Sequence, residues 1–258
     1  MLDVIDITII PAFLLVFARV LAFFITLPLF SYNTIPNLFK IGFSFILSLV
    51  MFTTMDTGTI AFDFTYIFLF IKEIGVGLLI GLIAYIILSA VQIAGGFIDF
   101  QMGFAVANVI DPQTGAQSPL IGQYFYMIAL LFLLSVNGHY LLIDGIYNSY
   151  QFIALDSTLS MGDNYATFII DAFNQMFLIA FQMSIPLVGC LFLVDVALGL
   201  IARTVPQLNV FVVGLPLKIG VSFLVLVVFM AIYITLARML FETMFDTMHS
   251  LMRILGGG

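Results

Sequence analysis

Long apolar runs that carry almost no charged residues dominate this sequence. Of its 258 residues, 63% are hydrophobic and 8% are charged, and the mean hydropathy is +1.24. Soluble domains contain about 25% charged residues, because a water-facing surface has to be covered with polar groups. A chain with so few charges cannot cover such a surface. We therefore expect an integral membrane protein, or a chain enclosed by other membrane proteins, with room for roughly six spans of about 20 residues.

The apolar runs predict an all-α fold built of membrane helices, since helices satisfy their own backbone hydrogen bonds in lipid. The run from about Tyr165 to Ala202 is nearly twice as long as a normal span. Either two half-helices meet in this run, or one helix projects beyond the bilayer. The other runs predicted to be helical are Ile7–Phe30, Leu38–Phe52, Phe64–Ser89, Leu120–Val136 and Val210–Leu236.

The end of the chain, Ala237–Leu255, has the pattern of an amphipathic C-terminal helix. Its polar side carries Glu242, Asp246, His249 and Arg253 at helical spacing. Its apolar side carries Phe241, Met244, Phe245, Met248, Leu251, Met252 and Leu255. We interpret its methionines as packing residues rather than as a metal or redox site.

Composition and motifs argue against several classes of function. The chain has fourteen Asp and Glu residues but seven Lys and Arg residues. This acidic balance argues against nucleic acid as a partner and against a polybasic contact with anionic lipid. His139 and His249 lie far apart and Cys190 stands alone, so no metal site is predicted. HExxH, CxxC, GxSxG and phosphate-cradling motifs are absent. We therefore expect no enzymatic activity and no cofactor. Asp171 and Asp195 could form an intramembrane aspartyl pair, but their surroundings resemble no proteolytic motif.

Charged residues in or next to the apolar runs are the main functional candidates. Such residues are costly in a bilayer and mark either a transport pathway or a pair between helices. We interpret them as ion-pair partners within the membrane or across a subunit interface, with a proton or ion relay as the alternative. Lys72 and Glu73 point about 100° apart on a helix, so we expect that they do not pair with each other and that each meets a group on another helix or chain. The candidates are Arg19, Lys72, Glu73, Asp99, Asp171, Asp195, Arg203 and Lys218.

The central segment, Gly95–Gly115, is too polar for a lipid-facing helix and too apolar for an ordinary loop. Its glycines loosen the backbone, and the pair Asp111-Pro112 predicts the end of a helix. Non-helical backbone in a membrane assembly persists where it is buried in protein or lines a cavity. We therefore interpret the segment as an internal loop at a pore or cavity. A short connector between two membrane helices is the alternative.

Two separated groups of motifs give the chain a resemblance to a known family. The first group is Gly95–Phe104 (GGFIDFQMGF) followed by Val109–Pro112 (VIDP). The second is Ala202–Phe211 (ARTVPQLNVF) followed by Gly214–Lys218 (GLPLK). In this order they resemble the FliR family, the R subunits of the type III secretion export gate. The resemblance extends over nearly the whole chain, and the virulence-associated injectisome relatives share the pattern with the flagellar branch.

The resemblance implies an architecture and a set of partners. One R subunit would assemble with several P and Q subunits into a helical, funnel-shaped channel for unfolded flagellar proteins in the bacterial inner membrane, at the flagellar basal body. Residues 1–153 would resemble a P subunit, and residues 154–258 would form a Q-like long helical hairpin that ends in the amphipathic helix. Much of the apolar surface would pack on sister subunits above the membrane plane, and the rest would face lipid. The B and A subunits of the export apparatus would be further partners.

The resemblance also implies a role for a plug loop, about residues 95–119, which would close the channel at rest. An apolar constriction excludes water and ions by dewetting. The plug residues would be Met102, Phe104, Val106, Val109 and Ile110. The hinge residues would be Gly95, Gly96, Gly103 and Pro112. A competing hypothesis is a small secondary transporter with a coupling-ion site at Lys72, Glu73 and Asp195, but such a protein would carry inverted repeats, which the sequence does not show.

Overall fold

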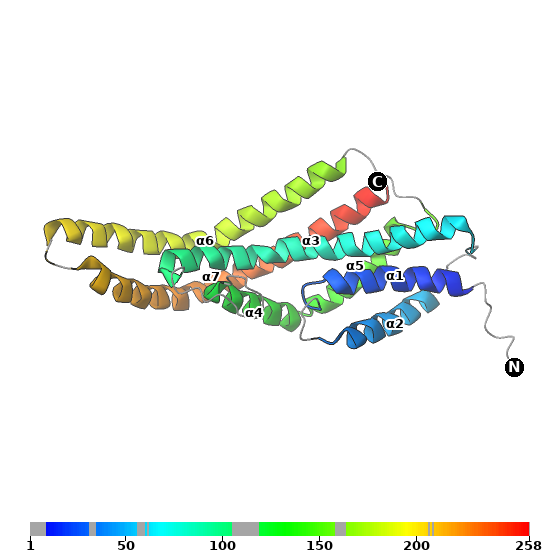
Figure 1. The fold of residues 1–258 in the computed structure, drawn as a ribbon, viewed down its shortest axis with the longest axis horizontal. Helices are drawn as coiled ribbons and strands as arrows, with labels where there is room; N and C mark the ends of the chain where they lie inside the picture. The colour runs from blue at the N-terminus through cyan, green and yellow to red at the C-terminus, as the bar shows by residue number, and fades with distance from the viewer. Residues whose placement is uncertain are drawn as a thin grey trace. The chain divides into compact units, whose positions relative to one another are not determined.

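The computed structural model describes residues 9–30, 35–55, 60, 62–104, 119–157, 164–205, 207 and 209–257. Within these ranges the regular structure is entirely helical (Figure 1). This confirms the predicted all-α fold. The helices are α1 (Ile10–Thr26), α2 (Asn37–Thr54), α3 (Phe64–Met102), α4 (Leu120–Ser135), α5 (Gly138–Phe152), α6 (Asn164–Thr204) and α7 (Val210–Leu255).

Four of the described helices are long and apolar enough to cross a membrane, namely α2, α3, α6 and α7. Helices α4 and α5 pass the same test when they are taken together as one broken span, and α1 has 17 residues. The described part of the chain therefore offers four or five candidate spans rather than six. The difference arises because α1, with 17 residues, and α4, with 16, are each too short to count as a span alone.

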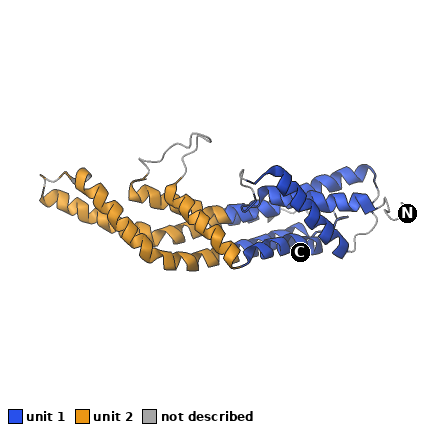
Figure 2. Ribbon diagram, turned by 90° about the horizontal axis from the view of Figure 1, so that it is seen from below, with its two compact units in different colours: residues 1–87, 137–173, 243–258 blue, residues 88–136, 174–242 orange. Residues whose placement is uncertain are grey.

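The chain divides into two compact units (Figure 2). Unit 1 comprises residues 1–87, 137–173 and 243–258, and unit 2 comprises residues 88–136 and 174–242. Helices α3, α6 and α7 each contribute residues to both units. This division describes packing within the chain. The predicted boundary between residues 153 and 154 concerns likeness to P and Q subunits and stays a prediction.

Small residues on α3 allow α1 to pack closely in unit 1. A Cβ atom on Gly77 would collide with the carbonyl oxygen of Arg19 and lie 2.9 Å from the Cβ of Ala22. One turn further on, a Cβ on Gly81 would collide with the hydroxyl of Thr26. Glycines four residues apart lie on one face of a helix and let a neighbouring backbone approach. This glycine stripe fixes which face of α3 meets α1.

A hydrogen-bonded aspartate precedes α3. Asp63 accepts hydrogen bonds from the hydroxyl of Thr65 and, at 3.0 Å, from its backbone N–H. The side-chain bond from Thr65 is the main reason that the pKa of the Asp63 carboxyl lies below its usual value. The ionised side chain thus satisfies a backbone donor that the first turn of a helix leaves free.

Aromatic pairs hold the helices of unit 2 together. The rings of Phe125 on α4 and Tyr233 on α7 stack with centroids 4.5 Å apart, and the Tyr233 hydroxyl donates to the carbonyl of Phe125. The rings of Phe97 on α3 and Phe181 on α6 stack at 5.1 Å. Large apolar rings with a satisfied polar tip are well suited to such a core.

Helix α3 continues through Gly95 and Gly96 to Met102, so the interpretation of Gly95 as the start of a non-helical loop is wrong. The physical reason is packing. A Cβ on Gly95 would collide with the backbone of Gly122 on α4, so this glycine provides space between two helices rather than backbone freedom. The non-helical connection begins at Gly103, which has a left-handed φ of +88°. Asp111-Pro112, where we expected the helix to end, lies outside the described residues.

The last two helices are both much longer than a normal membrane span, as the run Tyr165–Ala202 predicted for α6. Helix α6 is continuous over 41 residues, so of the two alternatives for this run the structure has the single long helix. Helix α7 runs for 46 residues through the expected boundary at Ala237. Its C-terminal part confirms the amphipathic prediction. The predicted polar residues Glu242, Asp246, His249 and Arg253 are exposed, while Phe241, Met244, Met248, Leu251, Met252 and Leu255 are buried.

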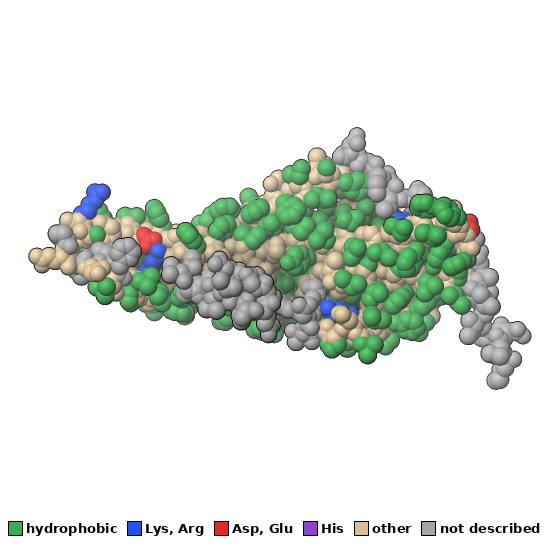
Figure 3. All heavy atoms as spheres, in the orientation of Figure 1, with side chains coloured by type: hydrophobic (Ala, Val, Ile, Leu, Met, Phe, Trp, Pro, Cys, Tyr) green, Lys and Arg blue, Asp and Glu red, His purple; other side chains and the backbone are tan. Residues whose placement is uncertain are grey.

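Much apolar surface remains uncovered on α6 and α7. Within the 18-residue apolar window of each helix, 11% of α6 and 22% of α7 is buried, against 61% for α3. Hydrophobic side chains cover much of the face drawn in Figure 3. Soluble monomers seldom expose apolar patches of this extent, so lipid or other proteins must cover this surface.

Candidate functional site

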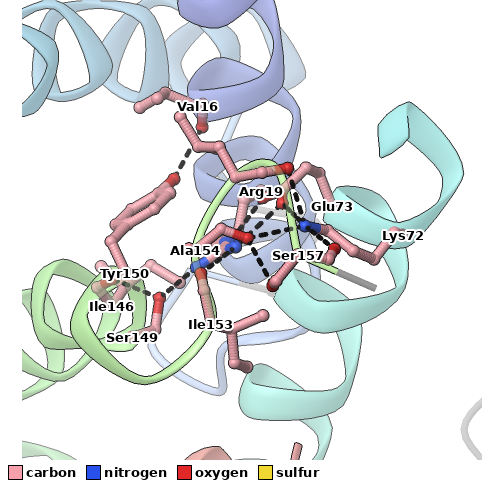
Figure 4. A network of polar contacts seen from close by, with 11 residues as sticks. Val16, Arg19, Lys72, Glu73, Ile146, Ser149, Tyr150, Ile153, Ala154 and Ser157 are labelled. Atoms are coloured by element: carbon pink, nitrogen blue, oxygen red, sulfur yellow. Dashed lines mark hydrogen bonds and ion pairs between the residues drawn. The ribbon is translucent and has the colours of Figure 1, made fainter. Parts of the chain in front are cut away.

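An arginine and a glutamate form a fully buried ion pair in unit 1 (Figure 4). Arg19 on α1 donates from Nε and Nη2 to the two carboxylate oxygens of Glu73 on α3, the second bond at 2.9 Å. Both side chains have 0% exposure. Glu73 lies one turn before Gly77, on the face of α3 that meets α1. The close approach at the glycines thus brings the carboxylate within reach of the guanidinium.

The remaining donors of Arg19 fix the end of α5. Its Nη1 donates to the hydroxyl of Ser149 at 3.0 Å, and its Nη2 also donates to the carbonyl of Ile153 at 2.9 Å. The guanidinium lies 4.0 Å from the centroid of the Tyr150 ring. A planar cation with five donors can make all these contacts at once.

Lys72 completes this network. Its Nζ donates to the carbonyl oxygens of Ala154, Leu155 and Ser157 at 2.9 to 3.0 Å. It also lies 2.9 Å from Oε1 of Glu73. The expectation that these two neighbours are not partners is therefore wrong, because the four-carbon stem of lysine lets its charge reach the adjacent carboxylate. Each residue also meets a group elsewhere in the chain, as expected.

The network joins α1, α3 and the turn after α5 through two cations and one carboxylate. Breaking a buried ion pair leaves an uncompensated charge, which costs about 3–5 kcal/mol. The cations already contact several protein oxygens, so the arrangement is suited to holding elements together. We define Arg19, Lys72 and Glu73, with their partners Ser149, Tyr150 and residues 153–157, as the unit 1 network.

A second polar cluster lies in unit 2, where three helices meet. Nζ of Lys218 on α7 lies 2.7 Å from Oδ2 of Asp195 on α6. The side-chain amide of Gln101, in the last turn of α3, donates to the same oxygen at 2.8 Å. The side chains of Lys218 and Asp195 are 15% and 39% exposed. We define Gln101, Asp195 and Lys218 as the unit 2 cluster.

Asp99 provides a polar contact at the start of α4. Its side chain is 1% exposed, and its two carboxylate oxygens lie 3.2 and 3.1 Å from the backbone N–H of Ile121. The first turn of a helix has free N–H donors and a positive end of the helix dipole, both of which favour an acidic partner. Asp99 thus caps α4 from a neighbouring helix.

The predicted plug and hinge residues are only partly within the described chain. Met102 is fully buried in unit 2, and Phe104 and Gly103 are half-buried. A Cβ on Gly103 would lie 3.1 Å from the side chain of Leu215. Val106, Val109, Ile110 and Pro112 lie outside the described residues. The plug and hinge roles therefore stay predictions.

The structure thus gathers the candidate charges into three places. Arg19, Lys72 and Glu73 meet in unit 1, Asp195 and Lys218 meet in unit 2, and Asp99 lies at the start of α4. Asp171 and Arg203 are exposed on α6. Within the described ranges, no group of three or more His, Cys, Asp and Glu is arranged to hold a metal ion.

Sequence reasoning missed several residues of these sites. Ser149, Tyr150 and Gln101 are uncharged, so nothing distinguishes them from ordinary helix residues in the sequence. The acceptors for Lys72 are backbone carbonyls, which leave no residue-type signal. Only their position after a short polar helix, Gly138–Phe152, hints that this turn is not lipid-facing.

Apolar helices long enough to cross a bilayer, held together by buried charges, define an integral membrane protein of the all-helical class. The chain belongs to the family of bacterial export proteins, family 1, whose pattern it matches over residues 10–244. This confirms the resemblance that the two groups of motifs indicated.

Individual relatives agree with this assignment. The chain is 57% identical over 249 residues to the flagellar biosynthetic protein FliR of Bacillus subtilis (strain 168). The aligned region covers 95% of this chain and 96% of that protein. It is 28% identical to FliR of Escherichia coli (strain K12), over 88% of this chain and 87% of that protein. It is also 31% identical to the Yop proteins translocation protein T of Yersinia pestis, over 83% and 84% of the two chains.

Proposed function

We propose that this protein is the R subunit of a flagellar type III export gate. In this proposal it assembles with P and Q subunits into a channel for unfolded flagellar proteins, contacts the B and A subunits, and catalyses no reaction. Its place is the bacterial inner membrane at the flagellar basal body. The similarity to FliR of Bacillus subtilis along 95% of the chain supports the flagellar branch, since the identity to the Yersinia translocation protein is lower, at 31%.

The observation that carries the proposed assembly is the length and exposure of α6 and α7. At about 1.5 Å per residue, helices of 41 and 46 residues are about 60 and 70 Å long, whereas the apolar core of a bilayer is about 30 Å thick. Lipid can cover only part of such helices, so protein partners have to cover the rest. Strongly exposed side chains on them include Phe192, Leu193, Leu200, Leu224, Val227 and Val228.

The P-like and Q-like division belongs to the same proposal. Residues 154–258 contain α6 and α7, two long helices joined by a short connection, as expected for a Q-like hairpin. Residues 1–153 contain the shorter helices and α3, as expected for a P-like part. The uncovered apolar sides of the hairpin would then pack against sister subunits.

The plug proposal assigns channel closure to Met102, Phe104, Val106, Val109 and Ile110. Apolar side chains at a constriction block small ions by dewetting. The left-handed backbone at Gly103 supports this proposal, because it turns the chain out of α3 immediately before Phe104. Pro112 would be the hinge residue on the other side of the plug residues. Gly95 and Gly96 are helical in this structure, so Gly103 is the stronger hinge candidate of the three glycines.

The transporter alternative has less support. Its coupling-ion site would need Lys72, Glu73 and Asp195 to be available to an ion. Lys72 and Glu73 are engaged in the unit 1 network, and Asp195 is engaged by Lys218 and Gln101 in unit 2. Groups in fixed pairs of this kind are poorly suited to binding and releasing a coupling ion.

The plug proposal is tested by deleting residues 104–110 in a gate co-expressed and purified with its P and Q partners. We expect the deletion to raise small-ion leak across vesicles that contain the assembled complex. Native mass measurement serves as the control that both complexes have the same composition. If composition and leak both stay unchanged, the plug assignment is wrong.

The assembly proposal is tested by expressing the chain with and without the P and Q subunits. We expect a defined complex by native mass measurement when all three are present, and aggregation or degradation of the chain when it is alone. A stable, homogeneous monomer or symmetric dimer without partners would contradict the proposal.

A further inference from the structure

The last two turns of α3 make one polar contact near each end of the connection that runs from Gly103 to Pro119. At its far end, Asp99 caps the first turn of α4 through the backbone N–H of Ile121. At its near end, Gln101 donates to Asp195 on α6. Both contacts therefore start from the same short stretch of one helix.

The two contacts leave α3 on opposite sides. Residues two positions apart on a helix are separated by about 200° around its axis. Asp99 consequently meets α4, while Gln101 meets the unit 2 cluster formed with α6 and α7. Contacts from opposite sides restrain a helix end more strongly than two contacts on one face would. Directly after Gln101, Met102 has no exposed surface, and Gly103 leaves the helix with its φ of +88°.

We propose that Asp195, oriented by Lys218, is a positioning residue that holds the last turn of α3 through Gln101, opposite the contact that Asp99 makes with α4. The role of this contact in channel closure rests on the proposed function, but the contact itself does not. It fixes Met102 and Gly103, from which the proposed plug begins.

Stability alone does not account for charges at this place. A partly exposed ion pair contributes little to stability, and charged side chains inside membrane segments are costly. The pair Asp195–Lys218 nevertheless lies at the one described contact between the end of α3 and a carboxylate of α6. Lys218 neutralises and orients the carboxylate, and the carboxylate then accepts the amide hydrogen bond of Gln101.

The direct test is hydrogen exchange of the last turn of α3 in the gate assembled with P and Q subunits. Gln101→Leu removes the amide and leaves the ion pair intact. Loss of a hydrogen bond to a charged group predicts about tenfold or faster exchange of the amides in this turn. Gln182→Leu, the same change at an exposed position of α6, is the control and should leave this exchange unchanged.

A second set of variants separates positioning from simple charge burial. Asp195→Leu should accelerate exchange to the same extent, and Asp195→Leu combined with Lys218→Met should remain fast, although no unpaired charge is left. The exchanged pair Asp195→Lys with Lys218→Asp should restore slow exchange, because Gln101 can then accept from the lysine. Asp246→Leu is the matched control at an exposed aspartate of α7.

The outcomes distinguish this inference from the proposed function. Unchanged exchange in Gln101→Leu, or slow exchange in the double apolar variant, would overturn the positioning role. Ion leak is measured on the same complexes beside the deletion of residues 104–110. If the deletion leaks and the Gln101 variant exchanges faster without leaking, the contact holds α3 but does not govern closure. If the deletion itself does not leak, the plug assignment fails whatever the exchange result.

Discussion

Among the individual residues, Glu73 is unusual because it is a buried anion between two cations, Arg19 and Lys72. Arg19 engages both of its oxygens, and Lys72 engages one of them again. Arginine suits its position since its fork binds the carboxylate and still reaches the hydroxyl of Ser149 and the carbonyl of Ile153. The neighbouring lysine places its charge among three carbonyls, where a compact ammonium is favourable.

Replacing Glu73 by Gln should destabilise unit 1 by about 3–5 kcal/mol, because two buried cations would lose their anion. The measurement is the temperature dependence of protease resistance of the chain in membranes that also contain P and Q subunits. Glu242→Gln is the matched control. Glu242 pairs with Arg238 one turn away, but both side chains are mostly exposed, so its loss should cost no more than about 0.5 kcal/mol. Equal effects of the two substitutions would contradict a structural role for the unit 1 network.

At the scale of single elements, the sequence does not show which glycines of α3 are needed for close helix packing and which are not. Gly95 faces the backbone of Gly122, whereas a Cβ on Gly96 would meet only the side chain of Pro119 at 4.0 Å. Glycine in a helix interior is about 0.5–1 kcal/mol less favourable than alanine. One of the two glycines is therefore required by packing, and the other is not.

Gly95→Ala should destabilise unit 2 by about 1–3 kcal/mol, because α3 and α4 would have to move apart. Gly96→Ala should be neutral or slightly stabilising. Thermal unfolding of the assembled complex, followed by circular dichroism, compares the two variants. A strong loss of export in Gly96→Ala without loss of stability would instead support the predicted hinge at this position.

The existence of the helices was predictable, because long apolar runs in a membrane protein have few other options. Their ends were less predictable. Gly95 and Gly96 have the composition of a loop, but packing against α4 keeps them in α3, and only the tertiary contact reveals this. In the same way α7 passes the apparent break at Ala237, because its C-terminal apolar face is buried in unit 1.

The candidate charges were also predictable, since an ion in an apolar run is conspicuous. Their partners were not. Lys72 finds three backbone carbonyls, and Asp195 finds a neutral amide in addition to Lys218. Contacts between residues more than 80 positions apart depend on helix packing that no local pattern encodes.

For the whole molecule, the exposed hairpin of α6 and α7 should decide assembly. Leu193→Arg places a charge at a side chain of α6 that is 67% exposed. We expect this variant to lose co-purification with the P and Q subunits, because burying an unpaired charge in an apolar interface is strongly unfavourable. Gln182→Arg adds the same charge at an exposed polar position of α6 and serves as the control. Normal assembly of the Leu193 variant would place this surface against lipid instead.

Unit 1 contains both residues 1–87 and residues 243–258. The hydroxyl of Tyr165 donates to the carbonyl of Ile254 at 3.2 Å, and Met248 lies against Gly145. A ribosome makes a chain from its first residue onward, at about 5–20 residues per second. The nascent protein can therefore form the Arg19–Glu73 pair well before residues 243–258 have been made, yet this unit cannot close until those residues are available. Newly made molecules therefore pass through a stage in which α1 and α3 have already paired while the rest of unit 1 is still open.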